Sequence, residues 1–276
     1  MKKMLGLALA TSLGCSIQEG FSLLKKHGFD ATFTDVSNDE ELDLWANEAA
    51  KHGIFYSSLH APFDRAHLLW ENGINGDDAE KELIESIDAC ARINVPILVM
   101  HPFIGFQPHE PNETGLTRFR HFAEHADRRG IKIALENVEG EEHLHYLLEG
   151  LDDFPSVGFC LDSGHELCYN GEKDLLAIHG SRLIYTHINS NMGVTSPDGS
   201  ITWHDDAHML PFDGKVNMES LAKRLKACDY QGVLMLELVK GNRPNRSTND
   251  AYTKLSTDEY LAKAAQRIKK LRDMIE

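Results

Sequence analysis

Short apolar runs alternate with longer amphipathic stretches along the chain. The runs are almost continuously hydrophobic, which is the pattern of strands covered by helices on both faces. We therefore predict eight strands, over residues 4–10, 31–35, 54–60, 96–101, 131–136, 157–162, 183–187 and 233–237.

The amphipathic stretches between these runs predict helices. They cover residues 16–26, 39–51, 77–92, 141–148, 218–228 and 257–275, with a further helix that ends at Arg129. Gly28, Gly53 and Gly130 each follow a predicted helix, and glycine is the usual residue where a helix ends in a left-handed conformation. With the polar stretch that runs through Ile178, for which we give no helix bounds, we count eight helical segments.

Strands that alternate with helices predict a parallel sheet. Eight such units fit a (β/α)8 TIM barrel, for which about 250 residues is typical. The chain has 276 residues and no linker-like segment. We therefore predict the α/β class, with one barrel domain over residues 1–276.

Acidic and imidazole side chains stand where several predicted strands end: His60, His101, Glu136, Asp162, His187 and Glu237. A parallel barrel gathers its strand C-termini around one mouth, so these residues should become neighbours. One Glu or His at a strand end is usually a cap or a satisfied polar residue. The repetition of this placement instead indicates a divalent-metal site.

Three more residues join this set. His165 follows Asp162 by three positions, so a turn or the start of a short helix would present both to the mouth. Asp206 and His208 lie in the long segment 189–215, where alternation in an extended chain would turn both side chains to one side. The alternative for this pair is a solvated acidic loop. Barrel active sites are built from long loops of this kind.

Oxygen and nitrogen ligands without Cys suit Mn²⁺, Zn²⁺, Co²⁺ or Mg²⁺ and disfavour a closed structural zinc site. Phe63 and Trp70, in the loop after the third strand, are predicted to form an apolar lid near the mouth. The remaining histidines that we weighed are predicted at the surface: His67, His109, His121, His125, His143, His145 and His204.

The charge balance narrows the range of partners. The chain has 28 basic and 43 acidic residues, a net charge of −15, which opposes binding to a phosphate backbone. We expect a small-molecule partner, no nucleic acid and no membrane, and a homo-oligomer remains open. Five scattered cysteines favour reduced thiols and a cytoplasmic location.

The N-terminal residues have two interpretations. A short signal peptide with Cys15 as a lipobox cysteine is one of them. Leu13 stands where a lipobox prefers a small residue, and the apolar stretch is short. We therefore favour a first barrel strand over residues 4–10.

Seven segments, in order, carry a family resemblance: SLHAPF, LVMHPF, IALENV, CLDSGH, YTHINS, the Asp206-x-His208 loop and MLELV. Together they resemble the xylose-isomerase-like superfamily, which contains sugar isomerases and epimerases and the endonuclease IV family. The resemblance covers essentially the whole chain. Its motifs are specific to the superfamily but separate its members poorly.

The implied chemistry depends on the branch. In the epimerase and isomerase branches, the residues matching Glu136, Asp162, His187 and Glu237 hold one divalent ion. The two glutamates there also move a proton at carbon, and the residue matching His165 contacts a substrate oxygen. In the endonuclease branch, all nine residues match a three-zinc cluster: His60, His101, Glu136, Asp162, His165, His187, Asp206, His208 and Glu237.

Our leading hypothesis is a metal-dependent isomerase or epimerase of carbohydrate metabolism that acts on a sugar or sugar phosphate. Glu136, Glu237 and His165 are its predicted catalytic residues, and it would use one divalent ion, with up to three possible. The alternative is a multinuclear zinc phosphoester hydrolase of the endonuclease IV type. A non-catalytic metal- or sugar-binding barrel is a third hypothesis. Against the epimerase branch, no arginine follows His187 in HINSNMG, where ketose epimerases often carry one.

Overall fold

The computed structural model describes residues 2–10, 13–171 and 173–276. Eight parallel strands form one sheet in the order β7-β6-β5-β4-β3-β2-β1-β8. Their bounds are β1 Leu5–Leu7, β2 Ala31–Asp35, β3 Phe55–His60, β4 Ile97–Met100, β5 Lys132–Glu136, β6 Val157–Asp162, β7 Leu183–His187 and β8 Leu234–Leu236. The predicted (β/α)8 barrel is confirmed.

The sheet curls almost into a closed ring. β1 pairs with β8 over three residues, whereas β7 and β8 meet through one isolated bridge between Ile188 and Leu236. Two backbone hydrogen bonds support this bridge, from Ile188 N to Met235 O at 2.7 Å and from Glu237 N to Ile188 O at 3.3 Å. The barrel therefore has a short seam between its last two strands.

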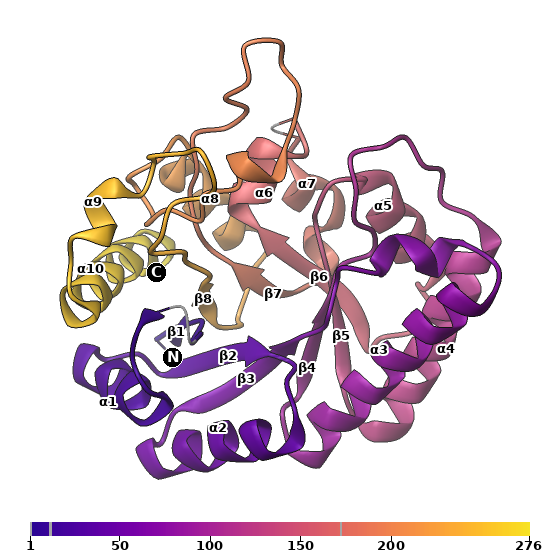
Figure 1. Ribbon diagram of the computed structural model, residues 1–276, viewed down its shortest axis with the longest axis horizontal. Coiled ribbons are helices and arrows are strands. Elements are labelled where there is room, and N and C mark those ends of the chain that lie inside the picture. The colour runs from indigo at the N-terminus through magenta and orange to yellow at the C-terminus, as the bar shows by residue number, and fades with distance from the viewer. Residues whose placement is uncertain (1, 11–12, 172) are drawn as a thin grey trace.

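Helices surround the strands on the outside (Figure 1). Their bounds are α1 Ile17–His27, α2 Asp39–His52, α3 Ile74–Arg92, α4 Glu113–Arg129, α5 Glu141–Gly150, α6 Ser163–Cys168, α7 Leu175–His179, α8 Met218–Ala227, α9 Asp250–Thr253 and α10 Thr257–Ile275. Short 3-10 turns lie at η2 Ala66–Trp70, η3 Gly180–Arg182 and η4 Trp203–Asp205. The segment between β7 and α8 projects beyond the ring in Figure 1.

Capping residues explain where the helices begin and end. Ser16 and Asn38 accept hydrogen bonds from the first turns of α1 and α2, and Ser256 forms a capping box with Glu259 at the start of α10. Gly28 and Gly53 end α1 and α2 in the left-handed conformation, as predicted.

Some predicted elements are wrong at their ends or in number. The first strand covers only Leu5–Leu7, and β4 and β8 each stop one residue before His101 and Glu237. The stretch after β6, for which one helical segment without bounds was predicted, contains two helices, α6 and α7, because Asp162 and Asp174 cap them. The short α9 was also missed.

Two apolar layers hold the strands in place. Side chains that include Phe33, Tyr185 and Met235 fill the barrel interior. A larger layer, with Phe21, Phe122 and Leu271 among its fully buried members, lies between the strands and the helices. Strands packed on both faces form a rigid ring, which fixes the positions of the residues at their C-terminal ends.

Within the described part of the chain, no helix combines the length and the apolar character that crossing a membrane requires.

Candidate metal centre

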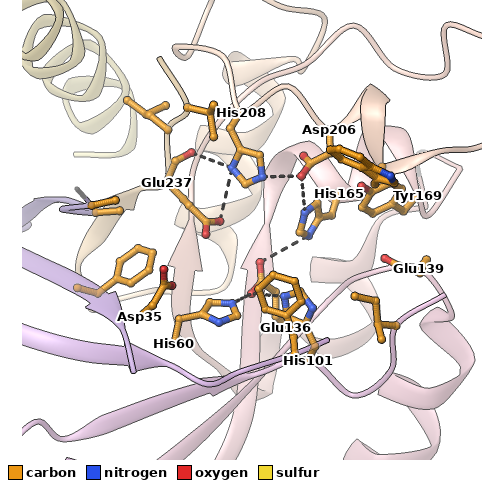
Figure 2. A pocket seen from close by; sticks show the side chains of 18 of the residues that line it. Asp35, His60, His101, Glu136, Glu139, His165, Tyr169, Asp206, His208 and Glu237 are labelled. Atoms are coloured by element: carbon orange, nitrogen blue, oxygen red, sulfur yellow. Dashed lines mark hydrogen bonds and ion pairs between the residues drawn. The ribbon is translucent and has the colours of Figure 1, made fainter. Parts of the chain in front are cut away.

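A cavity of about 470 Å³ opens at the C-terminal ends of the strands. Seven of the nine predicted site residues line it: His60, His101, Glu136, His165, Asp206, His208 and Glu237. The other two, Asp162 and His187, are fully buried, and they offer ligand atoms within 4.8 Å of those of Glu136 and Glu237. The structure thus brings all nine residues together, and Figure 2 shows the seven lining residues converging from several strands and loops.

Glu136, at the end of β5, is the centre of this cluster. Its Oε1 lies 3.0 Å from His187 Nδ1, and its Oε2 lies 3.2 Å from His60 Nε2 and 3.5 Å from His101 Nε2. Burial alone would raise the pKa of Glu136, but the charge of His187 and the hydrogen bonds of the three imidazoles hold it well below its usual range. The carboxylate is therefore ionised although only 1% of the side chain is exposed.

Glu237 follows β8 and faces the same histidine. Its Oε2 lies 3.2 Å from His187 Nδ1, and its backbone carbonyl accepts a hydrogen bond from His208 Nδ1 at 3.1 Å. Burial opposes ionisation, but the charges of His187 and His208 outweigh it and bring the pKa of Glu237 to about 2. The side chain is 22% exposed, against 1% for Glu136. Glu237 is thus the carboxylate that is more open to the cavity.

Asp206 and His208 turn toward the cavity together, with Asp206 Oδ2 2.5 Å from His208 Nε2 and 3.3 Å from His165 Nε2. The predicted route to this placement, alternation in an extended chain, is wrong. Asp206 follows η4, and His208 has a left-handed backbone with φ of 44°. A hydrogen bond from Val239 N to His208 O anchors this turn to the segment after β8. The solvated-loop alternative is wrong as well, since both side chains are buried.

Asp162 positions His165 in the predicted way. Its Oδ1 accepts hydrogen bonds from the backbone N–H groups of Gly164 and His165, at 2.8 and 2.7 Å, and so caps α6. Its Oδ2 accepts a hydrogen bond from Asn189 Nδ2 at 2.6 Å. Burial raises the pKa of Asp162 to about 7. The cap places the His165 ring at the cavity, where its Nδ1 donates to Asn137 O at 2.9 Å.

One buried carboxylate oxygen of the cluster, Asp206 Oδ1, has no hydrogen-bond partner among the described residues. His101 Nδ1 and His187 Nε2 are unpaired as well, but the other nitrogen of each ring is the one that faces Glu136. Leaving a buried polar atom unpaired costs about 1–3 kcal/mol, so such atoms call for a partner. The surrounding donors form groups of oxygen and nitrogen atoms, with the Cys160 thiol in one of them, and the atoms of each group lie within 4.8 Å of one another. This set fits a divalent cation of the predicted kind.

The pKa values of two histidines in the cluster show that its carboxylates stabilise a nearby positive charge. Burial alone would lower the pKa of His187, but Glu136 and Glu237 raise it well above its usual value. Likewise, burial opposes the charged form of His208, yet Asp206 and Glu237 bring the pKa to about 9. A divalent cation would replace these protons, because a metal ligand must be deprotonated.

Several cavity residues were missed by the sequence analysis: Asp35, Glu139, Tyr169, Trp203 and Arg243. Asp35 carried a usable signal, since it ends β2 and pairs in register with His60, which ends β3. The other four follow strands at irregular distances, and no periodic pattern marks them.

Two placements were predicted wrongly. Phe63 lines the cavity, but Trp70 is buried, and its Nε1 donates to Pro102 O at 2.8 Å. Gly115, in the first turn of α4, leaves room for the Trp70 ring, so this side chain packs into the protein and forms no lid. His143 was predicted at the surface but is fully buried, stacked on Phe103 with ring centroids 4.2 Å apart.

His143 should make the protein acid-sensitive. Burial lowers its pKa from 6.5 to about 4, so the folded protein binds this proton more weakly than the unfolded chain does. The resulting stability is fully present above pH 6.5 and is lost as the pH falls toward 4. Between pH 7 and pH 5 we expect a loss of about 2 kcal/mol from this group. Urea unfolding of His143→Leu and the parent at both pH values should show a smaller pH dependence in the variant, and equal dependence would contradict this assignment.

Comparison with known proteins gives concordant results. The family model described as xylose isomerase-like TIM barrel matches residues 21–271. An uncharacterized protein of Sinorhizobium fredii, y4fM, is 29% identical over 261 residues, which cover 80% of each chain.

Among solved structures, the IOLI protein with a bound zinc atom has a TM-score of 0.76 at 21% identity, covering 100% of this chain and 99% of that one. D-allulose 3-epimerase from Methylomonas sp., in complex with D-allulose, has a TM-score of 0.72 at 16% identity, covering 98% of each chain. At these identities, the two structures show a shared fold.

Proposed function

Because the chain belongs to the xylose isomerase-like TIM barrel family, we propose that it is a divalent-metal-dependent isomerase or epimerase of a sugar or sugar derivative. One observation carries the proposal: ligand atoms of Glu136, Asp162, His187 and Glu237 lie within 4.8 Å of one another at the base of a cavity. The zinc of the IOLI protein and the D-allulose of the epimerase are consistent with it. Residues that line the cavity come from positions as far apart as Ala8 and Arg243, which supports the further proposal that residues 1–276 act as one domain.

These four residues would hold the ion. A divalent ion supplies Lewis acidity, which makes the C–H between a carbonyl and a hydroxyl group easier to deprotonate. Glu237 is ionised and partly open to the cavity, so its carboxylate would take the proton from carbon. On the other side, Glu136 would take a proton from the His60 imidazole, whose Nε2 lies 3.2 Å from its Oε2, and pass it to carbon. His165 would orient a substrate oxygen. Phe63 and Trp203, which line the wall, would exclude water from the reacting carbon.

Metal content and hydrogen exchange together test this proposal. Elemental analysis of protein purified without added chelator or metal should find one equivalent of Mn, Co, Zn or Mg. The same protein in D₂O should exchange a carbon-bound hydrogen of a ketose or ketose phosphate, as followed by NMR. Protein that holds one ion but exchanges no such hydrogen across a sugar panel would contradict the isomerase proposal.

A second candidate function has its own supporting observation. His60, His101 and Glu136 form one ligand group, and His165, Asp206 and His208 form another, beside the four-residue group. Three groups could hold two or three ions, the arrangement suited to phosphoester hydrolysis. This alternative is a multinuclear zinc phosphoester hydrolase of the endonuclease IV type.

Replacement of His208 separates the two candidates. His208→Ala removes a ligand only from the group that His208 forms with His165 and Asp206. The metal content should therefore fall by one equivalent in a multinuclear site and stay unchanged in a one-ion site. Elemental analysis of both proteins gives the answer. His204→Ala, on the neighbouring turn η4 and outside the ligand groups, is the matched control.

A further inference from the structure

Arg243 is the only Lys or Arg among the described residues that line the cavity. It lies between β8 and α9, and its side chain is 25% exposed. The cavity lining also carries carboxylates outside the four-residue metal group, at Asp35, Glu139 and Asp206. A lone guanidinium in an acidic cavity therefore requires an explanation.

Three contacts hold the guanidinium of Arg243 in a fixed orientation. Its Nε donates to the backbone carbonyl of Asp206 at 2.6 Å, and its Nη2 lies 3.2 Å from Asp206 Oδ2. The guanidinium carbon also lies over the Trp203 ring, 5.8 Å from the centroid. A long side chain fixed in this way loses little further freedom when it binds a ligand.

These contacts leave part of the donor fork unused. The Nη1 group of Arg243 donates no hydrogen bond to any described residue. Trp203, on which the guanidinium rests, also lines the cavity and is 48% exposed. Arginine presents its donors in a planar fork that matches the oxygens of a carboxylate or a phosphate.

The local sequence adds positive charge at the same place. Lys240, Arg243 and Arg246 fall within seven residues of a chain whose net charge is −15. Arg246 is paired with Asp205 at 3.5 Å, and Lys240 lies outside the residues that line the cavity. Only Arg243 presents its charge to the cavity, so it is the one candidate of the three for contact with a bound ligand.

We propose that Arg243 binds an anionic substituent of the substrate, a phosphate or a carboxylate. The inference rests on the proposed isomerase function and narrows its substrate to a sugar phosphate or sugar acid. Asp35 lies on the opposite side of the cavity from Asp206 in Figure 2. Its carboxylate would repel an anion and accept hydrogen bonds from hydroxyl groups, which gives the substrate one orientation.

Calorimetric titration of the metal-loaded protein with matched sugar pairs tests this. The pairs are D-fructose with D-fructose 6-phosphate and D-glucose with D-glucuronate, and inorganic phosphate is a minimal probe. The anionic member of one pair should bind more tightly than the neutral member, and the pair that shows this distinguishes phosphate from carboxylate. Arg243→Met should weaken binding of that anion by about 10- to 100-fold and leave the neutral sugar unchanged. Arg243→Lys should lose less, and Lys240→Met should lose nothing.

Several outcomes would overturn the inference: equal affinity within both pairs, equal loss for both members in Arg243→Met, or no binding of any anionic probe at millimolar concentration. The metal content of Arg243→Met must match that of the parent, since Asp206 is both a candidate ligand and a partner of Arg243. If anion binding depends on Arg243 but no sugar exchanges hydrogen in D₂O, the isomerase proposal fails and the anion site stands. If neutral ketoses exchange hydrogen and anions bind no better than neutral sugars, the anion site fails and the isomerase proposal stands.

Discussion

Glu237→Gln should lower turnover by about 10²- to 10⁴-fold while leaving the fold intact. The substitution keeps the size of the side chain and removes its capacity to accept a proton from carbon. Glu237 is the more open of the two central glutamates, so this loss falls on the proton-transfer step. The measurement is kcat for hydrogen exchange or product formation, with thermal unfolding to verify the fold.

The control for this variant is Glu149→Gln, the same chemical change on an exposed residue of α5. Turnover of the control should match that of the parent. Metal analysis of Glu237→Gln separates the loss of a base from the loss of the ion. Full activity in Glu237→Gln would remove this residue from the proton-transfer role.

Removal of the metal with a chelator should abolish activity and destabilise the protein. An ion present at 100 times its dissociation constant stabilises the folded state by about 2.7 kcal/mol, because it binds the folded chain and not the unfolded one. Without it, the cluster is left with a buried carboxylate oxygen, Asp206 Oδ1, that lacks a partner among the described residues. Urea unfolding with chelator, with added Zn²⁺ and with added Mn²⁺ measures the difference.

The same urea unfolding experiment on Glu136→Gln provides the comparison. This variant keeps the shape of the central side chain but loses the carboxylate that three imidazoles surround. Metal should therefore stabilise it much less than the parent. If added metal shifts both unfolding curves equally, or neither, the ion does not bind at this cluster.

Much of the fold could be predicted because each strand and helix of the barrel has a hydrophobic pattern within its own short stretch of sequence. β2, β6, β7 and α10 have the predicted bounds, since each has a clear apolar pattern and a sharp polar or capping boundary. The strand-end rule also led to the residues that converge at the mouth. Applied without exception, it would have included Asp35.

Features that depend on contacts distant in sequence could not be predicted. The burial of Trp70 depends on the space left by Gly115, and the burial of His143, in α5, depends on Phe103 from the loop after β4. The placement of Arg243 is another such case, since Asp206 and Trp203, nearly 40 residues earlier, hold it. Neither propensity nor periodicity reports such pairings.

The seam between β7 and β8 gives the proposed metal a mechanical role. His187 ends the strand on one side of the seam and Glu237 follows the strand on the other, while a single bridge joins the two backbones there. An ion held by both side chains would link the end of β7 to the segment after β8 across this gap. Amide hydrogens at Ile188 and Glu237 should then exchange with solvent quickly in stripped protein and slowly once metal is restored, which would make the closure of the ring itself dependent on metal.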